Sequence, residues 1–290
     1  FFDLSAISHT GDEPIWLTET GYNTAEQEVH PKLGVSDAAQ AKYLTRGLAD
    51  AFMQGVDRTY LYELADEGTD ETDMEDHFGI VEYQSDPTGA LTLKPAGESL
   101  KRLIDHLNDS VSSNFTPGEL DFTIDAGSAD ISNLRYLLLE ENDGAGTFNL
   151  LIWQEVNSYD AANQQEINNP PLNVTIRFND TISSAAVYNL NSDTAVSSYG
   201  STKVVSVAVP DEIMLIKLTP GTYNPSGSLP ILEVTATDPV AVEGTSDTGT
   251  FTFTRTGDTS QPYTFWVEIQ GEAANGADYT SQSTGIVFPA

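Results

Sequence analysis

The first hundred residues alternate short apolar runs with stretches of helical period. Residues 14–24, PIWLTETGYNT, begin with the apolar run Ile15–Leu17, which suits a strand buried on both faces. Glu19 lies where this strand opens into a loop, and Gly21 indicates the turn that follows. The pattern predicts a buried strand with one carboxylate at its C-terminal end.

A helix is predicted over residues 35–55, VSDAAQAKYLTRGLADAFMQG. Ser36 is a favourable N-cap, Asp37 complements the positive end of the helix dipole, and Gly55 indicates the end. The i, i+3, i+4 spacing of apolar positions predicts one buried face. Its members are Ala41, Leu44, Leu48, Ala51 and Phe52.

A second strand and a second helix follow in the same order. Residues 57–64, DRTYLYEL, are rich in β-branched and aromatic residues, and a long loop separates them from a helix predicted over residues 93–107. The apolar stripe of that helix is Leu100, Leu103, Ile104 and Leu107. Strand, helix, strand, helix is typical of a parallel sheet with right-handed crossovers.

From about residue 113 the pattern changes to short strands separated by Asn, Asp, Gly, Ser and Pro, which is typical of an antiparallel sandwich. The predicted strands are LRYLLLEE, FNLLIWQEV, NVTIRF, AAVYNL, KVVSVAV and EIMLIKL. Residues 220–230, PGTYNPSGSLP, form the clearest linker, and the alternating segments beyond it predict a second β-domain. We therefore expect domains at residues 1–112, 113–228 and 229–290.

The composition is strongly acidic, with 44 Asp and Glu against 12 Lys and Arg and a net charge of −32. This excess is spread over all three predicted domains. It disfavours nucleic acid and anionic membrane as partners, and it fits either a solvated surface or dedicated cation sites. The sequence has no cysteine, no apolar run of about 18 residues and no signal-peptide pattern at its first residues.

Four motifs in the first 112 residues carry a resemblance to a known family. They are TETGY at 18–22, QAKYLTRGLADAFMQG, RTYLYEL, and HFGIVEY followed by LKPAGESLKRL. In this order they resemble the C-terminal quarter of the (β/α)8 barrel of clan-A glycoside hydrolases. The resemblance implies that the strand ending at Glu19 is the seventh of the barrel and that Glu19 is the catalytic nucleophile.

The chemistry that the resemblance implies needs a second carboxyl group. A retaining glycosidase places two carboxyl groups about 5 to 5.5 Å apart, one as nucleophile and one as acid and base. In the family the second follows an Asn at the end of the fourth strand, so we expect it before Phe1, and we expect this chain to be inactive alone. The alternative for Glu19 is an ordinary strand-end carboxylate that caps the turn at Gly21. Tyr22 and Tyr62 are candidate walls of a sugar subsite or, alternatively, core residues.

The remaining domains also resemble known modules. Residues 113–228 resemble the β-sandwich that follows such barrels, with Trp153 predicted in its core and sugar binding as the alternative role. Residues 241–290 resemble the first half of an immunoglobulin-like Calx-beta sandwich, which implies that Glu243 and Asp278 are Ca²⁺ ligands. The acidic loop at residues 66–76 lacks the spacing of an EF-hand, so we expect a solvated, mobile loop.

The predicted fold class is therefore multidomain α/β plus all-β, with the last two βα units of a (β/α)8 barrel, an antiparallel β-sandwich and a partial Calx-beta sandwich. The predicted function is that of a C-terminal portion of a secreted, modular, retaining glycoside hydrolase acting on a polysaccharide. Structural Ca²⁺ is the one cofactor expected, none is expected for catalysis, and nothing in the sequence indicates an oligomer. The alternative is a non-catalytic extracellular adhesion or matrix protein with sugar-binding or calcium-binding β-modules.

Overall fold

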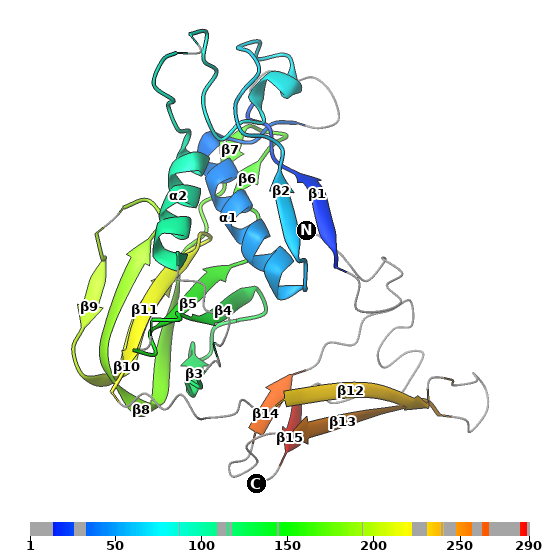
Figure 1. Ribbon diagram of the computed structural model, residues 1–290, viewed down its shortest axis with the longest axis vertical. Coiled ribbons are helices and arrows are strands. Elements are labelled where there is room, and N and C mark those ends of the chain that lie inside the picture. The colour runs from blue at the N-terminus through cyan, green and yellow to red at the C-terminus, as the bar shows by residue number, and fades with distance from the viewer. Residues whose placement is uncertain are drawn as a thin grey trace. The chain divides into compact units, whose positions relative to one another are not determined.

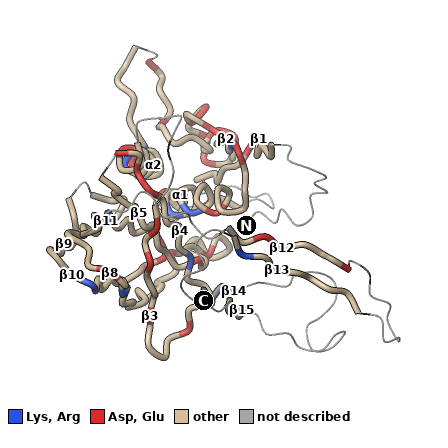
Figure 2. The backbone as a smooth tube through the Cα atoms, turned by 60° about the horizontal axis from the view of Figure 1, so that its bottom comes forward, with Lys and Arg blue, Asp and Glu red and all other residues tan. Residues whose placement is uncertain are grey.

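The computed structural model describes residues 14–25, 33–86, 88–108, 115, 118–143, 145–192, 194–221, 231–238, 240, 248–256, 263–266 and 285–288. The chain forms two compact units, one made of residues 1–115 and 120–223 and the other of residues 116–119 and 224–290. Figure 1 shows the strands and helices of both units. Acidic residues occur along loops and strands throughout the described chain, as Figure 2 shows.

The first unit begins with the predicted strand, helix, strand, helix order. Strand β1 (Trp16–Thr20) pairs in parallel with β2 (Arg58–Leu61), and the helices are α1 (Asp37–Met53) and α2 (Pro95–Leu107). The Ser36 hydroxyl accepts a hydrogen bond of 3.0 Å from the Ala39 amide, which confirms the N-cap of α1. Gly55 follows the helix with φ +83°, a conformation that favours glycine.

Part of α1 and the first turn of α2 pack against one face of the two-stranded sheet, next to Leu61 of β2. A small core of Ala41, Leu44 and Ala96 packs here, with Tyr22, Leu61 and Ile80 against it. The other face is open among the described residues, since Trp16 and Tyr60 are 52% and 45% exposed. The prediction of a strand buried on both faces is therefore wrong for the described part of the chain. Phe52 and Ile104, both predicted to be buried, are also exposed.

An antiparallel sheet of seven strands is the largest sheet of the first unit within the described residues. Its order is β10-β8-β11-β5-β4, with β3 and β9 also paired to β8. The strands are β3 (Phe122–Asp125), β4 (Leu134–Glu140), β5 (Phe148–Gln154), β8 (Leu172–Asn189), β9 (Ser197–Tyr199), β10 (Thr202–Val209) and β11 (Met214–Pro220). A separate hairpin consists of β6 (Tyr159–Asp160) and β7 (Gln165–Glu166).

Strand β8 corrects the predicted strand list, because NVTIRF and AAVYNL form one strand of 18 residues. Its first half pairs with β3 and β10, and its second half pairs with β9 and β11. In the core of the sheet, buried positions of β8 alternate from Val174 to Phe178, and after Ile182 they shift by one residue to Ala185 and Val187. Register irregularities opposite this point let the strand run on while its inward-facing positions change. The sheet curls around this core, which includes residues of β5, β8, β10 and β11.

The helices pack against the outer face of this sheet. Trp153 and Leu215 are fully buried there against Ala49 of α1 and Leu103 of α2, which confirms the prediction that Trp153 is a core residue. Its indole N–H donates to Glu155 at 2.7 Å. The two helices and the seven-stranded sheet therefore share a core within one compact unit. Within the described residues, the seven strands form one curled sheet and not a sandwich of two separate sheets.

A polar contact joins α1 to the seven-stranded sheet beside that core. Arg46 is 2% exposed, and its Nη1 atom donates to the carbonyl oxygens of Gln154, Val156 and Asp211 at 2.9, 3.0 and 2.9 Å. Its Nη2 atom lies 3.6 Å from the Glu155 carboxylate. One guanidinium group thus binds three backbone carbonyls at the ends of sheet strands and holds them against the helix.

Two neighbours of Arg46 on the same helix extend this contact. The Lys42 ammonium binds Asp211 at 2.9 Å, and the Tyr43 hydroxyl accepts hydrogen bonds from the amides of Ser158 and Tyr159 at 2.8 and 3.0 Å. The contact fixes the hairpin of β6 and β7 near the N-terminus of α1, where the Ser36 hydroxyl donates to the carboxylate of Glu166.

The second unit contains β12 (Ile231–Asp238) paired with β13 (Thr250–Thr256), and β14 (Tyr263–Trp266) paired with β15 (Gly285–Phe288). Both pairs are antiparallel. Antiparallel pairing is consistent with a β-domain, while the Calx-beta resemblance and the domain boundaries stay predictions.

Candidate functional site

Glu19 lies one residue before the C-terminal end of β1, and its side chain is exposed. Because β1 and β2 are parallel, their C-terminal ends open at the same edge of the sheet, where the Tyr62 amide donates to the Thr20 carbonyl at 2.8 Å. The register is irregular between Leu17 and Thr20, and such an irregularity turns side chains away from regular alternation. Glu19 is thus presented to solvent at the end of the strand, as the sequence predicts.

Tyr22 packs in the small core below this edge. Its ring centroid lies 5.0 Å from that of Tyr43, and it contacts the cluster of Ala41, Leu44 and Ala96. Burial, followed by the neighbouring Tyr43, raises the pKa of the Tyr22 hydroxyl. This environment corresponds to the core alternative, and a role in sugar binding stays a prediction.

Tyr62 lies beyond the end of β2 and binds the acidic loop. Its hydroxyl donates to Glu75 at 3.0 Å, and its ring stands edge-on to Phe78 with centroids 5.3 Å apart. This hydrogen bond, with the charge of Glu63 next in importance, raises the pKa of Tyr62 to about 12. The hydroxyl is therefore protonated at neutral pH and acts as a donor.

The acidic loop has defined local structure, and its side chains are exposed or half-buried; that the loop is mobile stays a prediction. A 3₁₀ helix spans Met74–His77, and the Asp73 side chain caps it by accepting from the Glu75 amide at 3.0 Å. The Asp76 carboxylate accepts from the Asp70 amide at 3.0 Å. Its acidic side chains bind the loop's own backbone, which is how short acidic residues stabilise turns.

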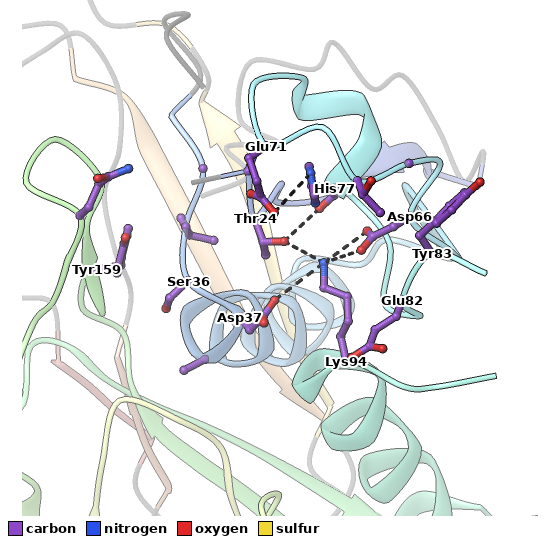
Figure 3. Close-up of a pocket in the computed structure, with 17 residues that line it drawn as sticks. Thr24, Ser36, Asp37, Asp66, Glu71, His77, Glu82, Tyr83, Lys94 and Tyr159 are labelled. Atoms are coloured by element: carbon purple, nitrogen blue, oxygen red, sulfur yellow. Dashed lines mark hydrogen bonds and ion pairs between the residues drawn. The ribbon is translucent and has the colours of Figure 1, made fainter. Parts of the chain in front are cut away.

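A cavity of about 750 Å³ lies beside this loop. The segment after β1, the N-terminus of α1, the segment after β2, the start of α2 and the β6–β7 hairpin all contribute to its lining (Figure 3). The lining includes the polar side chains of Thr24, Asp37, Asp66, Glu71, His77 and Lys94. Neither Glu19 nor Tyr62 lines this cavity, so the two candidate sites are distinct.

Lys94 is the central charge of the cavity, and its side chain is 5% exposed. The ammonium donates to the Thr24 hydroxyl at 2.8 Å and to both carboxylate oxygens of Asp66 at 3.3 Å. Asp37 lies farther away, 3.8 Å from the same nitrogen. Burial raises the pKa of Asp66, and the charge of Lys94 opposes that shift. The pair is a buried ion pair that organises one side of the cavity.

His77 lies on the other side and is 8% exposed. Its backbone carbonyl accepts from the Thr24 amide at 3.0 Å, while its Nε2 atom lies 3.9 Å from the Glu71 carboxylate. Nε2 is buried and has no hydrogen-bond partner. The sequence does not identify this site, because His77 has no ligand spacing to another histidine and Lys94 reads as an ordinary residue before a helix.

The predicted calcium ligands Glu243 and Asp278 fall outside the described residues. Within the described part of the chain, no group of three or more His, Cys, Asp or Glu side chains is arranged to hold a metal ion. The described helices include none with the length and apolar character needed to span a membrane.

Comparisons with known proteins concern the fold. No family model and no curated protein matches the sequence. One of seven matching solved chains is a family 39 glycoside hydrolase from the gut symbiont Bacteroides cellulosilyticus, with a TM-score of 0.45 and 16% sequence identity. The similarity covers 71% of this chain and 34% of that one. This chain therefore spans about a third of the length of the glycoside hydrolase that it resembles.

Proposed function

We propose that the chain is the C-terminal portion of a secreted, modular, retaining glycoside hydrolase that cleaves a polysaccharide. The observation that carries the proposal is the exposed carboxylate of Glu19 at the C-terminal end of β1, a strand paired in parallel with β2. Catalytic side chains of parallel β/α folds lie at this end of the strands. The order β1, α1, β2, α2 supports placing these strands at the end of such a barrel.

In this mechanism a Glu19 carboxylate oxygen attacks the anomeric carbon, and the bond to the leaving oxygen breaks as the glycosyl ester forms. A second carboxyl group gives its proton to the leaving oxygen and later takes one from the water that cleaves the ester. We propose that this group comes from a segment of the parent protein before Phe1. The Tyr62 hydroxyl donates its one proton to Glu75, so it does not act as a base in this mechanism.

The test is hydrolysis of an aryl glycoside by the parent protein with Glu19→Gln. We expect loss of turnover with an unchanged circular dichroism spectrum, because the substitution removes the nucleophile and little volume. Glu67→Gln, at an exposed position in the acidic loop, is the matched control and should retain activity. A 2-deoxy-2-fluoroglycoside should label Glu19 covalently. Turnover above a few per cent in Glu19→Gln would refute the assignment.

The C-terminal unit supports a separate, structural proposal. We propose that Glu243 and Asp278 bind Ca²⁺ in a complete Calx-beta domain, because both are acidic positions of the Calx-beta pattern and Ca²⁺ prefers carboxylate oxygens. Calorimetric titration of the complete domain with Ca²⁺ should give heat that Asp278→Asn reduces. An absence of heat with the wild-type domain would reject this site.

A non-catalytic, sugar-binding protein is the second candidate function. The observation that favours it is the cavity around Lys94 and His77, which is lined without Glu19. A parent protein that binds saccharides but hydrolyses no aryl glycoside would establish this candidate over the first.

A further inference from the structure

The segment that leaves β1, residues 20–24, lies against the segment that leaves β2. The Thr20 carbonyl accepts from the Tyr62 amide at 2.8 Å. A Cβ atom at Gly21 would lie 1.8 Å from the Tyr62 carbonyl oxygen, so only glycine permits this close approach. The backbone that continues from Glu19 is therefore packed directly against the end of the neighbouring strand.

Gln40 of α1 binds this segment one residue farther on. Its side chain is fully buried, and its Nε2 atom donates to the Tyr22 carbonyl at 2.8 Å. The same atom donates to the carbonyls of Gly79 and Phe78 at 3.2 and 3.5 Å. Nε2 has two hydrogens for these three acceptors, and Tyr22 is the nearest of them. One amide group thus joins the segment that follows β1 to the segment that follows the acidic loop.

The three carbonyls fix the orientation of the Gln40 amide. Rotating the amide by half a turn would set its oxygen against the carbonyl oxygen of Tyr22 and leave that carbonyl without this donor. The Oε1 atom is buried and has no hydrogen-bond partner among the described residues, so no second contact competes with the carbonyls for the amide. Gln40 is thus held in one geometry, and it gives the Tyr22 carbonyl one position.

Helix α1 gives this amide a fixed base. Before Gln40, the Ser36 side chain caps the helix. After it, Lys42 and Arg46 bind groups at the ends of strands in the seven-stranded sheet. Contacts on both sides of Gln40 restrict movement of the helical turn that carries it. The Tyr22 carbonyl is thereby held relative to the large sheet, and not only to the short strand β1.

We propose that Gln40 is a positioning residue for the Glu19 carboxylate, which it holds in place through the Tyr22 carbonyl and the short segment between them. The inference rests on the proposed hydrolase function, because Glu19 needs a fixed direction only if it attacks a substrate. Gln40 is fully buried, so it acts through this backbone and not by contact with substrate. Nucleophilic attack requires reacting atoms about 3 to 3.5 Å apart, and a displacement of about 1 Å lowers its rate by about a hundredfold.

The rate at which a 2-deoxy-2-fluoroglycoside labels Glu19 in the parent protein tests this inference. Gln40→Met keeps the length of the side chain and removes the amide. We expect the rate constant of labelling at saturating reagent to fall by about tenfold or more, and the concentration that gives half of this rate to change by about twofold or less. A merely structural effect would lower the fraction of protein that is labelled, because unfolded molecules do not react, and it would leave the rate constant unchanged.

Thr45→Val is the matched control on the same helix. Thr45 is 2% exposed, and its hydroxyl donates to the carbonyls of Ala41 and Lys42 at 2.9 and 3.1 Å. Both contacts lie within α1, so their loss should leave the rate constant of labelling as in the wild type. Gln40→Asn, which draws the amide back by one methylene, is a second variant that should slow labelling as Gln40→Met does.

Labelling of Gln40→Met at the wild-type rate would overturn the inference while leaving the hydrolase proposal intact. Equal slowing in Thr45→Val would also overturn it, because the effect would then belong to α1 as a whole. If Gln40→Met does not fold, Gln40→Asn decides by the same rate constant. A wild-type parent protein that is neither labelled nor active would instead refute the proposed function, and this inference with it.

Discussion

Replacing Arg46 with methionine tests how helix α1 and the seven-stranded sheet are held together. Methionine retains an apolar stem of similar length but removes the guanidinium group. Three backbone carbonyls then lose their donor, and the carboxylate of Glu155, 8% exposed, loses its nearby cation. The change therefore leaves the buried Glu155 carboxylate without its cation, and one buried carbonyl and two part-buried carbonyls without this donor.

The contacts of Arg46 set the expected decrease in the free energy of unfolding. Hydrogen bonds from a charged donor contribute about 1.5 to 3 kcal/mol each, and the two hydrogens of Nη1, shared among three carbonyls, give about 3 to 5 kcal/mol. Breaking a buried ion pair by removing one partner costs about 3 to 5 kcal/mol. These contributions describe the same group and are not additive, so we expect the free energy of unfolding to fall by about 4 kcal/mol.

The assay is urea unfolding followed by tryptophan fluorescence and circular dichroism, because Trp153 lies in the core beside this contact. Arg177→Met, at an exposed position of β8, is the matched control and should change stability by about 0.5 kcal/mol or less. Adding Glu155→Gln to Arg46→Met should recover part of the loss, since it removes the unpaired charge. A loss below about 1 kcal/mol for Arg46→Met, or one equal to that of Arg177→Met, would refute the reasoning.

Two further predictions concern α1 and α2. Burial, followed by the charge of Glu155, raises the pKa of Asp50 to about 6, above its ordinary value of about 4. The folded state then binds the proton more tightly than the unfolded state, so its stability falls as pH rises from about 4 to 6. Asp50→Asn should therefore stabilise the protein by about 1 kcal/mol at pH 7.5 and by less at pH 5, after allowance for solvent screening. Equal stability changes at both pH values would contradict this. Gly97→Ala should destabilise α2 by about 1 to 3 kcal/mol, because the added Cβ would lie 2.3 Å from the Ile80 carbonyl oxygen. Gly47→Ala in α1, which meets nothing within 4 Å, should instead stabilise by about 0.5 to 1 kcal/mol, and thermal unfolding of both variants checks the pair.

Local patterns determined most of the elements of the first unit. The cap at Ser36, the glycine at Gly55 and the apolar period between them predicted α1, because these signals act within a few residues. Trp153 was predicted in the core from one apolar strand. The position of Glu19 near the end of a strand was likewise predicted from an apolar run followed by a turn signal, and its exposure was found only in the structure.

Only the tertiary structure decided how these elements combine. NVTIRF and AAVYNL become one strand because β8 changes partners along its length, and no local signal reports which strands will pair with it. The exposure of Phe52 also depends on tertiary packing. Helix α1 packs against the parallel strands through Ala41 and Leu44 and against the seven-stranded sheet through Ala49, and Phe52 lies on neither contact. Periodicity reports that a face is apolar, and the fold decides which part of it is covered.

The polar sites also depended on the tertiary structure. Arg46 reads as a solvated residue of a helix until three carbonyls more than 100 positions away surround it. Asp37, Lys94 and the loop that holds Glu71 and His77 are separate segments, and the spacing of these residues along the chain carries no motif. A buried charge is tolerated only where partners compensate its desolvation, and those partners are brought together by folding. The sequence by itself therefore determined helices, strands and one strand-end carboxylate, whereas the cavity around Lys94 and the Arg46 contact were decided by the packing of distant segments.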